Sequence, residues 1–138
     1  MVRTSRPWRI GRSGAAVVEY AFIAPAFIAL LVGAVDVARM AWTASTIAFA
    51  AREGTRYAIV RPIGSVEPAT TEGVTQRVKS RAYGLSGDDI AVAVSWTPAN
   101  VSGAAVRVDV STQYDSLLVG FFAIGPFQLT SASTMTIF

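Results

Sequence analysis

The chain has 138 residues, 52% of them apolar, and a mean hydropathy of +0.45, which allows one small domain but is too apolar for an ordinary soluble one. Its net charge is +3: Arg3, Arg6, Arg9 and Arg12 contribute +4, and residues 15–138 carry eight basic and nine acidic side chains. The eight basic residues are scattered, which argues against a nucleic-acid partner. Without cysteine or histidine, a disulfide framework, the usual zinc sites and Ser-His or Cys-His nucleophiles are excluded, so we expect no enzyme activity, metal or cofactor.

The apolar segment 15–35 contains a single charged residue, Glu19. At about 1.5 Å per residue, a helix of this length spans roughly 31 Å, which matches the hydrocarbon core of a bilayer. We therefore predict a transmembrane helix over 15–35, preceded by a basic leader peptide over 1–14. Because the arginines precede the span and Asp36 follows it, the positive-inside rule places the N-terminus in the cytoplasm and the rest of the chain on the exported side.

The helix is expected to continue beyond the membrane as an exported extension over 36–60. This segment contains no proline, is rich in alanine, and places Asp36 three residues before Arg39 on one helix face. Pro62 is expected to end it.

Residues 61–138 are predicted to form one small exported α+β domain. A loop leads into a short amphipathic helix that contains Val74 and Val78. Beyond Gly87 apolar and polar residues alternate, which predicts two strands, and 129–138 supplies a third. The alternating apolar residues are Ile90, Val92, Val94 and Trp96 in the first strand and Val106, Val108 and Val110 in the second. The expected fold is therefore a long helix packed on a small antiparallel sheet of about three strands.

A distinctive motif lies where the leader meets the span. Residues 12–20, RSGAAVVEY, place a basic leader and a glycine before four apolar residues, which are followed by an acid and an aromatic residue. This motif resembles the processing site of type IV prepilins. The resemblance continues through Pro25, Asp36 and 50–57 and is to the TadE-like family, minor pseudopilins of the tight-adherence pilus; it covers about residues 12–60.

The resemblance implies processing by a membrane-embedded prepilin peptidase that cuts between Gly14 and Ala15 and leaves Glu19 and Tyr20 in the mature helix as assembly residues. It implies a structural subunit of the bacterial inner membrane that helps to assemble or initiate thin adhesive pili. Its partners would be other pseudopilins and pilus-assembly proteins. The exported half is equally compatible with a TadF- or TadG-like protein, whereas its size disfavours a major pilin.

Glu19 has a physical reason to bind a partner. A carboxylate inside the bilayer costs on the order of 2 to 3 kcal/mol or more, and the span contains no cation to pair with it. Cleavage before Ala15 would create a free amine, which could pair with Glu19 of a neighbouring subunit packed about one helical turn out of register. The alternative is that Glu19 lies one turn inside the headgroup layer and is partly hydrated.

Small residues recur every four positions in the span and form a ridge on which another helix could pack closely. These residues are Ala21, Pro25, Ala29 and Gly33, and the pattern returns outside the membrane at Ala50, Gly54 and Ala58. Pro25 lacks the N–H that would bond to the Ala21 carbonyl, so we expect a kink or local unwinding there.

Three further features are less specific. The apolar stretch 116–127 either packs on the domain's own helix or meets a partner or membrane surface. Within 52–57, the arginines, Glu53 and Tyr57 are expected to form a solvated face. The pairs 79–80 and 88–89 resemble catalytic or metal chemistry only superficially and are expected to be ordinary surface.

The principal alternative is a secreted or membrane-anchored binding domain. Residues 1–34 would then be an ordinary signal peptide or anchor, with small residues at Val32, Gly33 and Ala34 for signal peptidase. Glu19 argues against it, because an acid is disfavoured in the apolar core of a cleaved signal. A membrane-bound enzyme finds no site constellation in the sequence.

Overall fold

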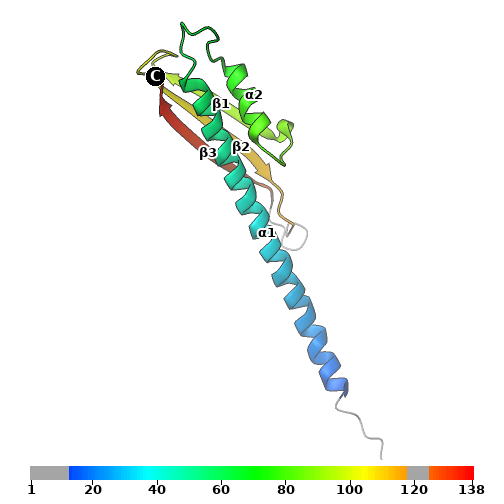
Figure 1. The fold of residues 1–138 in the computed structure, drawn as a ribbon. Helices are drawn as coiled ribbons and strands as arrows, with labels where there is room; N and C mark the ends of the chain where they lie inside the picture. The colour runs from blue at the N-terminus through cyan, green and yellow to red at the C-terminus, as the bar shows by residue number, and fades with distance from the viewer. Residues whose placement is uncertain (1–12, 118–124) are drawn as a thin grey trace, which may run out of the picture.

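The computed structural model describes residues 13–117 and 125–138, and consists of a long helix with a small head packed along its C-terminal half (Figure 1). The elements in chain order are α1 (Ser13–Ile59), α2 (Thr71–Arg81), the 3-10 turn η1 (Gly87–Asp89), β1 (Ile90–Thr97), β2 (Ala105–Tyr114) and β3 (Phe127–Thr136). The predicted α+β class, with a long helix on a three-stranded antiparallel sheet, is confirmed. Residues 1–12 of the predicted leader, 1–14, lie outside the described residues.

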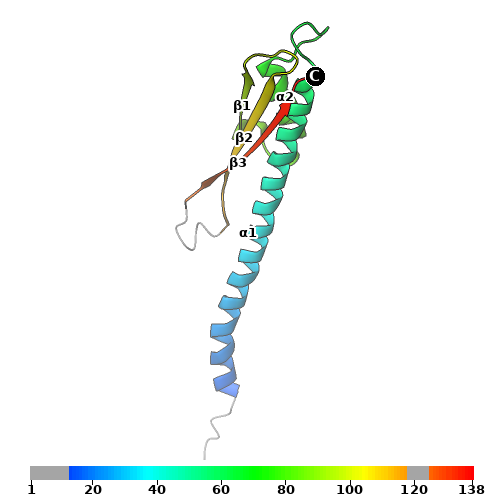
Figure 2. The same cartoon turned by 90° about the vertical axis from the view of Figure 1, so that its left-hand side faces the viewer.

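Helix α1 runs for 47 residues without interruption and includes Pro25. Local unwinding at Pro25 was therefore a wrong expectation: the proline removes one backbone hydrogen bond, and the bonds on either side keep the helix continuous. Within the described part of the chain, α1 is the one helix long and apolar enough to cross a membrane. Its N-terminal half extends away from the head in both views (Figures 1 and 2).

The sheet has the order β1-β2-β3, with both pairs antiparallel. Helices α1 and α2 cover one face of it, α1 over β2 and β3 and α2 beside β1 (Figure 2). The alternation of apolar and polar residues along β2 determines which face of the sheet the helices cover. Val106, Val108 and Val110 are fully buried beneath the helices, whereas Arg107 and Asp109 project from the opposite face and bind each other at 2.8 Å. Burying each valine stabilises the sheet by about 1.5 to 3 kcal/mol.

The close approach of α1 and α2 depends on Gly54. A Cβ atom at this position would lie 2.5 Å from Val78 Cγ2, so α2 leaves no space for a side chain. Ala50 and Ala58, one turn to either side, are fully buried. At the exported small-residue ridge another helix does pack closely, and that helix is α2 of the same domain, which presents Val74 and Val78 to it.

Asn100 ties together the two loops at the far end of the head. Its side-chain amide donates to the carbonyls of Arg61 and Ala69, at 3.2 and 3.0 Å. The chain also ends here, where the Phe138 N–H donates to the Ile59 carbonyl at the end of α1. The sheet is therefore held to α1 at this end by backbone groups as well as by the apolar core.

Candidate assembly site along the long helix

Gly14 and Ala15 lie in the first turn of α1, which begins at Ser13. Both residues are exposed, and a Cβ atom on Gly14 would meet nothing within 4 Å. The peptide bond between them is therefore at an open end of the helix, distant from the head. The cut between them remains a prediction.

Glu19 and Tyr20 lie one turn further along the free half of α1. Both are exposed, Tyr20 at 72%. Among the described residues Glu19 forms neither an ion pair nor a hydrogen bond, and the next cation along the helix is Arg39, about five turns away. Residues 13–117 and 125–138 therefore supply no cation that compensates the Glu19 carboxylate.

The ridge in the span is left uncovered by the head. Ala21, Pro25 and Ala29 are exposed, and Gly33 is half-buried where α1 begins to pass beside the head. The structure thus separates two ridges that look alike in the sequence: the exported one is filled by α2, and the one in the span is free among the described residues. Helix packing at the latter stays a prediction.

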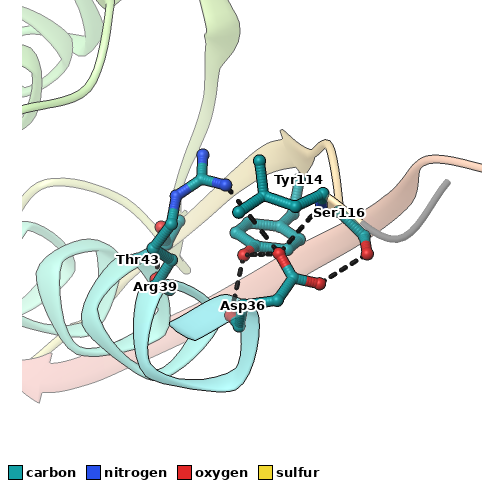
Figure 3. A network of polar contacts seen from close by, with 6 residues as sticks. Asp36, Arg39, Thr43, Tyr114 and Ser116 are labelled. Atoms are coloured by element: carbon teal, nitrogen blue, oxygen red, sulfur yellow. Dashed lines mark hydrogen bonds and ion pairs between the residues drawn. The ribbon is translucent and has the colours of Figure 1, made fainter. Parts of the chain in front are cut away.

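Asp36 follows the predicted span, 15–35, and the structure gives it a role that the sequence did not indicate (Figure 3). Although it is a carboxylate, it is only 7% exposed. Its oxygens accept hydrogen bonds from the Ser116 hydroxyl, from the Leu117 backbone N–H at 2.9 Å and from the Tyr114 hydroxyl at 2.9 Å. The Tyr114 hydroxyl also lies 2.9 Å from the Asp36 backbone carbonyl. We call this set of contacts the Asp36 junction.

The hydrogen bonds of the Asp36 junction favour the ionised carboxylate. The Ser116 hydroxyl and the Leu117 N–H hold the pKa of Asp36 below its ordinary value, and burial only partly opposes them. Burial and the bond to Asp36 raise the pKa of Tyr114, so this hydroxyl stays protonated and able to donate. Arg39 adds a guanidinium 3.8 Å from the carboxylate and 5.8 Å from the Tyr114 ring centroid.

The pairing of Asp36 with Arg39, expected from their spacing, is present, but it is the weakest part of the junction. The stronger contacts come from residues about 80 positions later in the chain, which no local pattern relates to Asp36. One signal was available: a tyrosine at an inward position of a strand, such as Tyr114, needs a partner for its buried hydroxyl.

The segment 52–57 is only partly the solvated face that was expected. Arg52 and Arg56 are exposed, but Glu53 reaches across to Arg77 of α2 at 3.6 Å and so links the two helices. The Tyr57 ring lies 4.1 Å beneath the guanidinium of Arg61. These side chains belong to the packing of α1 on the head.

The two pairs that superficially resemble reactive chemistry lie on the surface. Asp88 and Asp89 are exposed in η1, and Lys79 and Ser80 are exposed on α2. No cluster of three or more metal-ligating side chains occurs in residues 13–117 or 125–138. The candidate functional features among the described residues are therefore the free half of α1 and the Asp36 junction.

The family model described as TadE-like protein matches residues 14–56. The resemblance drawn from the sequence is confirmed over that segment, which is α1 from Gly14 nearly to its end. The matched segment includes Glu19, Asp36 and Gly54, whereas α2 and the sheet lie beyond it. No curated protein sequence and no solved structure matches the chain.

Proposed function

We propose that this protein is a membrane-anchored, pseudopilin-like structural subunit that takes part in the assembly of tight-adherence pili. The match to the TadE-like family supports an association with this pilus, and the single long apolar helix supports a single-pass membrane protein. One observation carries the proposal: an apolar helix that extends free of its head presents Glu19, a carboxylate without a partner in the described chain.

In this proposal the two halves of α1 have different tasks. The free half packs against other subunits in the membrane, where Glu19 pairs with the amine of a neighbour's Ala15 after the leader has been removed. The half beyond Asp36 carries the head, and the Asp36 junction begins where the span ends. The protein performs no chemistry itself; the prepilin peptidase acts on it.

Identifying the N-terminus of the membrane-extracted protein tests the proposal. Ala15 as the first residue is expected from prepilin processing. Val35 would instead indicate signal peptidase and the secreted binding domain, and Met1 or Val2 a plain membrane anchor; both results contradict the proposal.

The variant Gly14→Ala tests the assigned cut, since the peptidase in families of this kind reads the glycine beside the membrane face. We expect the leader to stay attached, which mass spectrometry detects. Because a Cβ on Gly14 meets nothing, the variant leaves the fold intact, and loss of processing is then not a folding effect. If it still loses the leader when the peptidase is present, the assigned cut is wrong.

A further inference from the structure

The end of the β2–β3 hairpin lies at the level where the apolar span ends. Asp36 follows Val35, the last residue of the span, and Leu117 donates its backbone N–H directly to Asp36 at 2.9 Å. Figures 1 and 2 show the end of β2 and the start of β3 on the side of the head nearer the N-terminal half of α1, and in Figure 2 the start of β3 turns away from the helix; the rest of the head extends toward the other end of α1. The Asp36 junction thus fixes the height of the hairpin end above the span.

Exposed apolar side chains occur at this level. Leu117 is 48% exposed and Phe127, which pairs with Tyr114 across the strands, is 37% exposed; Gly125 and Pro126 between them are exposed as well. The sequence contains no charged side chain from Ser116 to the last residue. Two acidic groups lie at this height: Asp36, whose oxygens are occupied by hydrogen bonds from the hairpin, and Asp115, which is exposed.

We propose that this hairpin end, Ser116, Leu117 and 125–127, rests in the lipid headgroup layer on the head's side of the membrane that α1 spans. The headgroup layer is about 5 to 8 Å thick on each side of the hydrocarbon core, and Asp36 lies only about 1.5 Å along the helix beyond the span. The half-exposed Arg39, one turn further, is placed to meet lipid phosphates. The surface is thus continuous with the lipid contact of α1 itself.

This inference rests on α1 spanning a membrane and not on a role in pili. It gives the Asp36 junction a purpose beyond holding the hairpin: the buried carboxylate nearest the apolar span is satisfied by protein donors, while Asp115 beside it stays exposed. The head would then have two membrane contacts, the helix and the hairpin end, which together limit its tilt.

The absence of cysteine makes a direct test possible, because a single introduced cysteine is the only site that a thiol-reactive fluorophore can label. The test positions are Leu117→Cys and Gly125→Cys; the second adds a side chain where nothing lies within 4 Å. The matched controls are Leu30→Cys in the span and Val66→Cys, which is fully exposed in the loop at the far end of the head. Val66 follows the end of α1, which is roughly 35 Å from Asp36 along the helix.

The labelled full-length proteins are placed in vesicles of phosphatidylethanolamine and phosphatidylglycerol with or without a lipid spin-labelled at its headgroup. We expect the fluorophore at Leu117→Cys and Gly125→Cys to be blue-shifted and several-fold more quenched by this lipid than at Val66→Cys. Spectra at the two test positions that match Val66→Cys would overturn the inference. A blue shift without quenching would also overturn it, since the hairpin end would then be covered by a protein.

Two control measurements establish that the variants span the bilayer and that they are folded. A lipid spin-labelled deep in its acyl chain should quench the label at Leu30→Cys, which shows that α1 spans the bilayer. Circular dichroism shows that each variant is folded. Failure of pilus assembly in cells bears only on the proposed function, because the vesicle experiment contains no other subunit.

Discussion

Gly14 and Gly54 lie on the same helix but differ in the space around them. Gly14 has open space around it, whereas a side chain at Gly54 would collide with Val78 of α2. Glycine costs a helix about 1 kcal/mol relative to alanine, so Gly54 is tolerated because α2 must come close. At Gly14 the fold gives no such reason, which agrees with a role for that glycine outside folding.

The variant Gly54→Ala should destabilise the head by about 1 to 3 kcal/mol, because the added methyl overpacks the α1–α2 contact. This loss should exceed the gain in helix propensity. Thermal unfolding of the purified protein in detergent measures the effect, with Gly14→Ala as the control in which Tm does not fall. Adding Val78→Ala to Gly54→Ala should recover part of the loss; an unchanged Tm in the single variant would contradict the packing seen here.

Glu19 is the residue on which the proposed assembly role depends. Glu19→Gln should spare membrane insertion, since it lowers the transfer cost of the span by on the order of 2 to 3 kcal/mol, and should spare leader cleavage. Assembly should fail because the charge pair between subunits is lost. Co-purification with partner pseudopilins and a count of pili in cells carrying the variant measure this.

The control for Glu19→Gln is Glu67→Gln, the same change in an exposed loop of the head. Asp36 is unsuitable as a control because its carboxylate holds the hairpin, so its loss would disturb the head directly. Unchanged complexes and pili in Glu19→Gln would end the charge-pair mechanism. Loss of assembly only where cleavage also fails would show that Glu19 acts through recognition by the peptidase.

The Asp36 junction joins two elements, α1 and the end of the β2–β3 hairpin. Because the hydrogen bonds lower the pKa of Asp36 in the folded state, the carboxylate stabilises the fold at pH values above its unfolded pKa of about 4. That contribution is lost as the pH falls through the unfolded and then the folded value. We therefore expect the junction to be intact at neutral pH and to weaken below about pH 4.

The variant Asp36→Asn tests whether the charge of Asp36 stabilises the fold at neutral pH and loses that effect at low pH. The amide keeps the shape but cannot accept three hydrogen bonds as an ion does, so Tm at pH 7 should fall below that of the wild type. The gap between the two proteins should narrow as the pH is lowered below about 4, because the wild type then loses the same charge. A constant gap from pH 7 to pH 3 would show that the charge of Asp36 contributes nothing to the junction.

The elements were predictable from the sequence because their signals are local. The alternation of Val106, Val108 and Val110 with Arg107 and Asp109 specifies a strand and its buried face, and Pro62 bounds α1. Contacts between elements were not predictable in the same way. The ridge at Gly54 has the same spacing as the ridge in the span, and nothing in the spacing says that α2 fills one and not the other.

In the candidate site too, local sequence patterns revealed single residues but not the contacts between elements. Glu19 was identified because a charge within an apolar run is conspicuous in itself. The partners of Asp36 were missed because Tyr114 and Ser116 reach it only after the chain has passed through α2 and two strands. Sequence patterns thus identified Glu19, which is unusual in its local surroundings, and missed the role of Asp36, which arises from tertiary contacts.

At the scale of the whole molecule, a single continuous helix, α1, contains both the apolar segment and the part on which the head packs. The helix runs without a break from Ser13 to Ile59, and the head packs along it from Asp36 onward. The orientation of the span therefore decides on which side of the membrane the head lies. The four arginines before residue 13 favour a cytoplasmic N-terminus, and we therefore predict an exported head.

The last prediction follows from this continuity: the head is exposed on the outer side of the inner membrane. In spheroplasts, Val66→Cys should react with a membrane-impermeant maleimide, because Val66 is fully exposed at the end of the head far from the span. Added protease should remove the head under the same conditions, while a cytoplasmic marker stays intact. If Val66→Cys reacts and the head is digested only after detergent lysis, the topology inferred from the arginines is wrong and the head is cytoplasmic. The proposed pilus role would then fall as well, since a cytoplasmic head cannot join an external filament, whereas the fold and the Asp36 junction would be unaffected.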